Sequence, residues 1–199
     1  QLYPTDMAAS ANAVIAISGD YYIFRQLGIT VYQRQLYRFA PKSVDSCFFT
    51  ASGDMLFSRA GEMSSQEEAQ QFITDNDVTF AVAFGPVMVD NGQLAEFGSY
   101  PIGENNRTYS RTAIGQRDKL HYILMTINYE DDHSVAATVS EAAEYIFSKG
   151  VVKAYALDGG QTSTMVMNGH TVNRPDWGNQ RTQSDIIYFA TALPEEVNP

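Results

Sequence analysis

The chain consists of short apolar runs separated by polar turns that contain glycine or asparagine, a pattern typical of a strand-rich protein. The apolar run at 13–18 ends at Gly19-Asp20 and predicts a buried strand. Segments 29–39 and 46–58 each contain two apolar runs around a polar turn, so each predicts a hairpin. A further strand is predicted over 78–84.

Turn residues predict three more hairpins further along the chain. Asn91-Gly92 and Asn168-Gly169 suit type I′ turns, because both residues tolerate positive φ. The third hairpin, 111–127, turns at Arg117-Asp118-Lys119. Strands are also expected over 152–157 and 184–191, and 98–110 is expected to be a loop.

Two capping boxes predict helices. Ser64 and Glu67 form one capping box and predict a helix at 65–74. Thr138 and Glu141 form the other and predict a second helix that ends at Gly150. The second helix is supported by apolar residues at helical spacing, namely Val139, Ala142, Ala143 and Ile146. About ten strands and two helices predict an α+β fold with a largely antiparallel or mixed sheet, in a single domain over 1–199.

Charge and composition exclude some classes of partner. The 199 residues carry a net charge of −10, so the surface as a whole repels nucleic acid and anionic membranes. The longest apolar stretch is interrupted by Gly85-Pro86, and we expect no membrane insertion by this domain. Cys47 is the single cysteine, so no internal disulfide can form.

The sequence lacks the familiar catalytic signatures. It contains no G-x-S-x-G elbow and no Walker A loop. Its three histidines, His121, His133 and His170, have no metal-ligand spacing, so nothing indicates a zinc site or a Ser-His-Asp hydrolase.

Acids and arginines stand beside glycines near the ends of the expected strands. They are Asp20, Arg111, Asp158 (followed by Gly159 and Gly160), Arg174, Arg181 and Asp185. Carboxylates can act as acid, base or nucleophile at a glycosidic carbon, and guanidinium groups match phosphate oxygens. The set suits a substrate with both a sugar acetal and a phosphate. Taken singly, each residue also has a structural explanation as a turn cap or a surface counter-charge.

Five segments, taken in order, resemble the phosphodiester glycosidase family and its bacterial members in particular. They are residues 16–22, 80–93, 111–116, 155–175 and 180–189, and the resemblance extends from about residue 7 to 190. It implies hydrolysis of a sugar-1-phosphodiester, such as N-acetylglucosamine-1-phosphodiester, to free sugar and phosphomonoester. It also implies a secreted or cell-surface setting, with this domain cut from a longer exported protein.

The resemblance implies catalytic roles for Asp158, Asp20 and Arg111. It implies that substrate is bound by Gly159, Gly160, Thr162, Ser163, Asn173, Arg174 and Arg181. Glu141 matches a family glutamate, but its capping box explains it without catalysis. The sequence departs from the family pattern at Asn128, where an aspartate is common, and at Gln161, where a third glycine is usual.

In the expected mechanism, Asp158 is the base or nucleophile at the anomeric carbon, and Asp20 is a second acid or a ligand of a sugar hydroxyl. Arg111, with Arg174 or Arg181, holds the phosphate. A carboxylate separation of about 5–5.5 Å predicts retention of stereochemistry and roughly 6.5–9.5 Å predicts inversion; the sequence leaves both open.

No cofactor is required for this chemistry. Calcium is the candidate ion, with Asp20, Asp158 and Asp185 as its ligands, because it prefers hard oxygen donors. Two alternatives stay open: a non-catalytic glycan-binding or structural surface domain with the same fold, and an enzyme of altered chemistry that cleaves a plain α-glycoside or the P–O bond.

Overall fold

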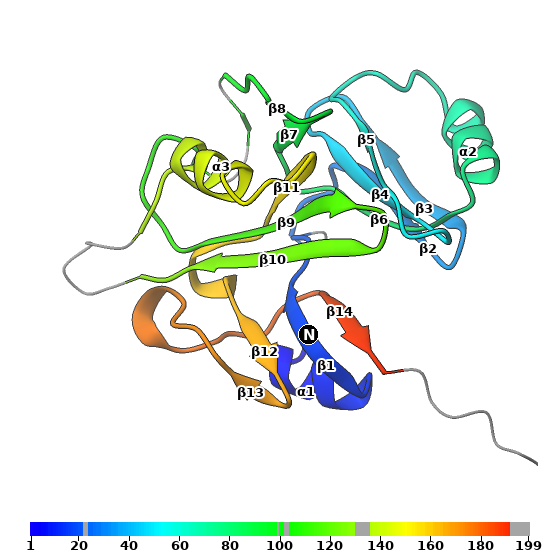
Figure 1. The fold of residues 1–199 in the computed structure, drawn as a ribbon. Coiled ribbons are helices and arrows are strands. Elements are labelled where there is room, and N and C mark those ends of the chain that lie inside the picture. The colour runs from blue at the N-terminus through cyan, green and yellow to red at the C-terminus, as the bar shows by residue number, and fades with distance from the viewer. Residues whose placement is uncertain (22–23, 99, 102–103, 130–135, 192–199) are drawn as a thin grey trace, which may run out of the picture.

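The computed structural model describes residues 1–21, 24–98, 100, 101, 104–129 and 136–191. This part of the chain forms three α-helices and fourteen strands, and the strands make three antiparallel sheets (Figure 1). The predicted α+β class is therefore confirmed. The sequence predicted a largely antiparallel or a mixed sheet, and the sheets are antiparallel. Within the described residues, no helix has the length and apolar character needed to cross a membrane.

The first sheet has the strand order β3-β2-β6-β4-β5. Its strands are β2 (Gly28–Tyr32), β3 (Gln35–Ala40), β4 (Ser46–Thr50), β5 (Met55–Ser58) and β6 (Val78–Val82). The helix α2 (Gln66–Asp75) lies beside this sheet (Figure 1). Ala69 and Ile73 of α2 are buried against Phe48 and Val78, so the helix covers one face of the sheet.

The second sheet has the order β10-β9-β11-β7-β8. Its strands are β7 (Val87–Asp90), β8 (Gln93–Leu94), β9 (Arg111–Asp118), β10 (His121–Ile127) and β11 (Lys153–Leu157). The helix α3 (Val139–Phe147) packs on it through Val139, Ala142, Ala143 and Ile146. Small residues on the sheet, such as Ala113 and Ala154, let the helix approach closely.

The third sheet has the order β13-β12-β1-β14. Its strands are β1 (Ala13–Ser18), β12 (Met165–Met167), β13 (His170–Thr171) and β14 (Ile186–Ala190). A helix that the sequence analysis missed, α1 (Pro4–Ser10), covers it through Ala8, which packs against Ala16 and Val166. Seven residues with only two buried side chains, Pro4 and Ala8, are too few for helical periodicity to show in the sequence.

The central core lies between the sheets, and successive side chains of one strand serve different cores. In β9, Ala113 faces α3 whereas Ile114 faces the central core. In β4, Phe48 faces α2 whereas Phe49 faces the central core. Strands buried on both faces carry continuous apolar runs instead of alternating ones, which explains the character of the runs in the sequence.

The predicted hairpins are confirmed, with Asn91-Gly92 and Asn168-Gly169 both at positive φ. The hairpin of β9 and β10 turns slightly later than predicted, because β9 extends to Asp118 and Leu120 takes the positive φ.

The first predicted capping box was wrong by one residue. The N-cap of α2 is Ser65, whose hydroxyl accepts from Glu68 N, and not Ser64. Ser64-Glu67 and Ser65-Glu68 have the same spacing, so spacing could not choose between them. The second box is confirmed: Thr138 and Glu141 cap α3 reciprocally.

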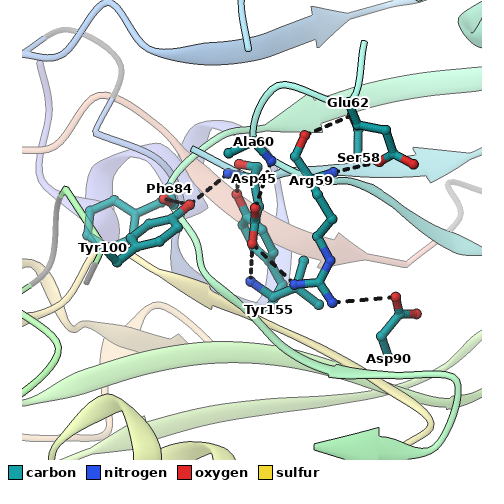
Figure 2. Close-up of polar contacts among 10 residues, drawn as sticks. Asp45, Ser58, Arg59, Ala60, Glu62, Phe84, Asp90, Tyr100 and Tyr155 are labelled. Atoms are coloured by element: carbon teal, nitrogen blue, oxygen red, sulfur yellow. Dashed lines mark hydrogen bonds and ion pairs between the residues drawn. The ribbon is translucent and has the colours of Figure 1, made fainter. Parts of the chain in front are cut away.

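A buried carboxylate, Asp45, fixes how the first two sheets pack together (Figure 2). Its oxygens accept hydrogen bonds from the backbone N–H groups of Ala60 (3.0 Å) and Val87 (2.9 Å), and Arg59 Nη1 lies 3.5 Å away. The Tyr155 hydroxyl donates to the Asp45 carbonyl at 2.7 Å. Asp45 therefore connects the entrance of β4, the loop after β5, and strands β7 and β11.

Candidate active site

Three strand ends meet at one point of the fold and bring distant residues together. In the β9–β11 pair, Leu157 lies opposite Thr112, so Asp158, just after β11, lies beside Arg111, the first residue of β9. The backbone N–H of Asp158 donates to the Gly19 carbonyl, just after β1, at 3.1 Å. The antiparallel register, with this hydrogen bond, thus brings Gly19, Arg111 and Asp158 close together.

A cavity of about 350 Å³ opens at this point, close to the lower end of the size range of small-molecule sites. Three acids and three arginines line it, namely Asp158, Asp176, Glu104, Arg25, Arg111 and Arg181. Its aromatic walls are Tyr21, Phe84, Tyr109 and Trp177. The cavity therefore combines carboxylates, cations and aromatic surfaces.

Asp158 is half-buried in this cavity, and its pKa is raised to about 7. Burial is the largest cause, and the negative charge of Asp20 adds to it. The Thr162 hydroxyl and the positive charge of Arg181 lower the pKa and oppose the shift in part. A carboxyl group with this pKa exchanges protons near neutral pH, which suits a catalytic acid or base.

Arg181 contributes a cation with unused hydrogen-bonding capacity. Its Nε is buried and has no hydrogen-bond partner within the described part of the chain. The guanidinium carbon lies 5.7 Å from the ring centroid of Tyr21 and 5.8 Å from that of Phe24, and these two rings stack on each other. Cation–π contacts position the guanidinium beside these rings, and Arg181 brings its positive charge to the cavity lining.

Arg111 is buried and holds the cavity wall. Its Nε donates to the Ala137 carbonyl at 2.9 Å, and its Nη2 donates to the carbonyls of Glu104 (3.1 Å) and Arg107 (2.5 Å). Burial lowers the pKa of Arg111 to about 10, so the group stays a cation at neutral pH. Arg111 therefore supplies charge to the cavity and also fastens two loops around it.

Gly159 and Gly160 are required by the backbone beside the cavity. A Cβ at Gly159 would lie 2.7 Å from the Ser110 carbonyl oxygen, which is closer than real Cβ contacts. Gly160 has a φ of +63° and donates its N–H to the same carbonyl at 2.8 Å. The close approach that the glycine pair permits is thus to the start of β9, and both glycines also line the cavity.

A sequence profile of the phosphodiester glycosidase family matches residues 11–190, nearly the whole chain. This chain belongs to the phosphodiester glycosidase family. The resemblance stated from the sequence is therefore confirmed.

Individual relatives are distant and longer. The SPbeta prophage-derived uncharacterized protein YomE of Bacillus subtilis (strain 168) is 24% identical over 186 residues, which cover 91% of this chain and 28% of YomE. The zebrafish N-acetylglucosamine-1-phosphodiester alpha-N-acetylglucosaminidase catalytic domain, in a structure described as auto-inhibited by its pro-peptide, matches with a TM-score of 0.76 at 18% identity, covering 96% of this chain and 67% of that one. A hypothetical protein from Synechocystis matches with a TM-score of 0.61 at 12% identity, covering 91% and 52%. At these identities the two structures show a shared fold.

Asp20, which the resemblance implied to be catalytic, is engaged by the backbone in this phosphodiester glycosidase domain. Its carboxylate accepts from Ala83 N at 2.8 Å and from Tyr21 N, and its own N–H donates to Asp185 Oδ1 at 3.0 Å. Asp20 lines a different groove, which it shares with Asp185. Burial raises the pKa of both carboxyl groups. Asp20 is therefore outside the described lining of the cavity, and each of its carboxylate oxygens accepts one backbone N–H bond.

The described residues contain no cluster of side chains that could bind the expected calcium ion. No group of three or more Asp, Glu, His or Cys side chains is placed there to hold a metal ion. Both carboxylate oxygens of Asp20 accept backbone N–H bonds, which a cation at the same oxygens would oppose. We therefore propose no metal site.

Three of the residues expected to bind substrate have side chains that bond to the protein itself. The Thr162 hydroxyl donates to the Gly159 carbonyl, and the Ser163 hydroxyl donates to the Arg111 carbonyl at 3.0 Å. The Asn173 amide donates to the Ser163 carbonyl and accepts from Met165 N, both at 2.7 Å. None of the three is among the described lining residues of the cavity.

Two other positions singled out from the family pattern also lie outside the described lining. Arg174 donates its backbone N–H to Asn128 Oδ1 at 3.1 Å, so the departure at 128 falls on a loop contact. An aspartate could accept the same bond. Gln161, in contrast, lines the cavity, so the second departure changes the site directly.

The sequence analysis missed several lining residues. Asp176 is buried and accepts from Ser110 N at 3.1 Å, next to the exposed Trp177. Glu104 accepts a hydrogen bond from the Tyr109 hydroxyl and pairs with Arg107 at 3.8 Å. Apart from the single tryptophan, whose position beside an aspartate could have been noticed, these residues lie in loops without a local signal.

Proposed function

We propose that this domain hydrolyses a sugar linked through its anomeric carbon to a phosphodiester, for example an N-acetylglucosamine-1-phosphodiester, and releases free sugar and a phosphomonoester. The observation that carries the proposal is that Asp158, a carboxyl group with a pKa of about 7, lies in one cavity with Arg181 and Arg111. A carboxylate for the acetal and cations for the phosphate match the two halves of such a substrate.

Asp158 acts in its ionised form at the anomeric carbon. It either takes a proton from the attacking water or forms a bond to the carbon that water later breaks. The C1–O bond breaks, and its electron pair leaves with the phosphomonoester. A phosphomonoester has its second pKa near 6, so the departing oxygen needs little protonation at neutral pH.

Arg181 is the principal phosphate ligand in this proposal. Arg181 lines the cavity, and the positive charge of its guanidinium group would attract an anion bound there. Arg111 already donates to three backbone carbonyls, so its contribution is mainly its fixed positive charge. Arg25, an exposed residue of the lining, provides a further cation at the rim. We assign no direct role to Arg174 or Asp20 in this proposal, because neither is among the described lining residues of the cavity.

The decisive experiment follows the bond that breaks. The domain is incubated with an activated sugar-1-phosphodiester in water enriched in oxygen-18, and both products are analysed by mass spectrometry. We expect the label in the sugar and none in the phosphomonoester. Label in the phosphate would show attack at phosphorus and overturn the proposal in favour of a phosphodiesterase.

The role of Asp158 is tested by Asp158→Asn, which keeps the size of the side chain but removes its ability to ionise. We expect turnover to fall by at least about a thousandfold with the fold intact. Glu141→Gln is the matched control, because Glu141 only caps α3 and lies outside the described lining. Full activity in Asp158→Asn would remove this residue from the mechanism.

A non-catalytic glycan-binding domain is the second candidate, and the Gln161 side chain in the cavity favours it. It predicts saturable binding of the sugar-1-phosphodiester with no turnover, even at high enzyme concentration. The secreted or cell-surface setting stays a prediction, which fractionation of cells that produce the natural protein would test.

A further inference from the structure

Trp177 is the single tryptophan of the chain and the most exposed of its large hydrophobic side chains in the described residues, at 74%. It stands at the cavity that contains Asp158 and Arg181. Aromatic side chains of this size are normally buried, because their apolar surface is unfavourable in water. An exposed tryptophan beside a polar cavity therefore requires an explanation.

The backbone presents this side chain in an unusual conformation. Trp177 has a φ of +62° and a ψ of 12°, in the left-handed region that bulky residues rarely adopt. Such outliers persist where the surroundings impose them, and they concentrate at functional sites. Exposure and backbone conformation are thus both unfavourable at Trp177, and nothing in the described fold uses its indole ring.

The turn that carries Trp177 is anchored to the cavity wall through the residue before it. The Asp176 carboxylate accepts from Ser110 N at 3.1 Å. Within the turn itself, Gly178 N donates to the Pro175 carbonyl at 2.9 Å and closes it. The turn is therefore anchored to the start of β9, the strand that also places Arg111, so the backbone of Trp177 has a fixed position beside the cavity.

We propose that Trp177 is the platform on which the sugar ring of the substrate stacks, an inference that rests on the proposed function and names the residue that recognises the sugar. The face of an indole ring carries negative electrostatic potential. It repels a phosphate, whereas it attracts the weakly positive C–H groups on the apolar face of a pyranose. The arginines bind the phosphate, and Trp177 binds the ring attached to it.

A single tryptophan makes binding directly observable. The emission of Trp177, excited selectively over tyrosine, is recorded while the 199-residue chain is titrated with N-acetylglucosamine 1-phosphate. Glycerol 3-phosphate, which has a phosphate but no sugar ring, is titrated in parallel. We expect a saturable shift to shorter wavelength with the sugar phosphate only, because stacking removes the indole from water. A sugar phosphate that binds by calorimetry without changing the emission would overturn the inference.

Variants give an independent test through kinetics. Trp177→Ala is expected to raise the KM for the sugar-1-phosphodiester by about tenfold, with a smaller change in kcat, and Trp177→Phe is expected to keep most of the affinity. Tyr145→Ala is the matched control, since Tyr145 is also an exposed aromatic residue (54%) but lies on α3, outside the described lining. An unchanged KM in a folded Trp177→Ala variant would contradict the platform role.

Failure of this inference and failure of the proposed function give different results. If the sugar phosphate shifts the emission but no diester is hydrolysed, the sugar platform stands and the hydrolase proposal falls. If the diester is hydrolysed with label in the sugar while the emission stays constant at saturation, the hydrolase proposal stands and the platform falls.

Discussion

The carboxyl group of Asp158 and the guanidinium group of Arg181 line the same cavity, and the charge of Arg181 lowers the pKa of Asp158 against the larger effect of burial. The balance leaves the pKa at about 7. A cation from one segment thus lowers the pKa of an acid from another, and this pair provides the first prediction.

Arg181→Gln removes the positive charge beside Asp158 and should raise the pKa of that carboxyl group further. If the ionised carboxylate is the active form, the rate rises as pH passes about 7 in the parent domain, and the rise moves to higher pH in the variant. The measurement is the pH dependence of kcat/KM. Arg181→Lys, which keeps the charge, should shift the profile less, and Arg117→Gln, at an exposed arginine outside the described lining, should not shift it.

Stability should also depend on the protonation of Asp158. Its pKa is about 7 in the folded state and near 3.8 in the unfolded state, so the folded state binds more protons between these values. The free energy of unfolding should therefore fall as pH rises from about 4 to 7, by up to about 1.4 kcal/mol per pH unit from this group. Urea unfolding at several pH values measures the slope. Asp158→Asn should make it shallower, and an identical slope in the variant would refute the assignment.

Gly159→Ala should destabilise the fold, because the added Cβ would lie 2.7 Å from the Ser110 carbonyl. Moving that carbonyl disturbs the start of β9, and we expect a loss of about 1–3 kcal/mol in the free energy of unfolding. Gly98→Ala is the matched control, since a Cβ there meets no atom within 4 Å. Chemical denaturation of both variants tests the difference, and equal stabilities would contradict the close approach.

Asp45→Asn should weaken the packing of the first two sheets. Both carboxylate oxygens accept backbone N–H bonds, and an amide can replace only one of them (Figure 2). The other N–H then faces an NH₂ group, which costs about 2–3 kcal/mol in a buried site. Asp77→Asn, in the exposed pair with Arg34, should change stability by less than about 1 kcal/mol. Thermal unfolding of the two variants provides the comparison.

Local elements followed from local signals. The hairpin at Asn91-Gly92 and the capping box of Thr138 and Glu141 depend on residues within one turn, so the sequence predicted them correctly. Where two local signals were equivalent, as at Ser64 and Ser65, the prediction failed by one residue. The short helix α1 buries only Pro4 and Ala8 and could not be recognised from periodicity.

Only some of the site residues could be predicted from the sequence. Asp158, Arg111, Arg181 and the glycine pair were named from the sequence, and the fold brings them to one cavity. Asp20 was named with equal reason, but its carboxylate satisfies the N–H groups of Ala83 and Tyr21. A carboxylate at a strand end looks the same in sequence whether its partner is a ligand or a backbone amide.

The order of residues alone established the strand-rich α+β class, most hairpins, one helix cap and the family. Each of these depends on periodicity, turn residues or motifs that lie within short stretches of the chain. Assembly of the three sheets selected which polar groups face the cavity and which bond to the protein, and it raised the pKa of Asp158 by burial. The partners of a side chain and its exposure to water depend on residues far away in the chain, so these properties arise only when the sheets pack together.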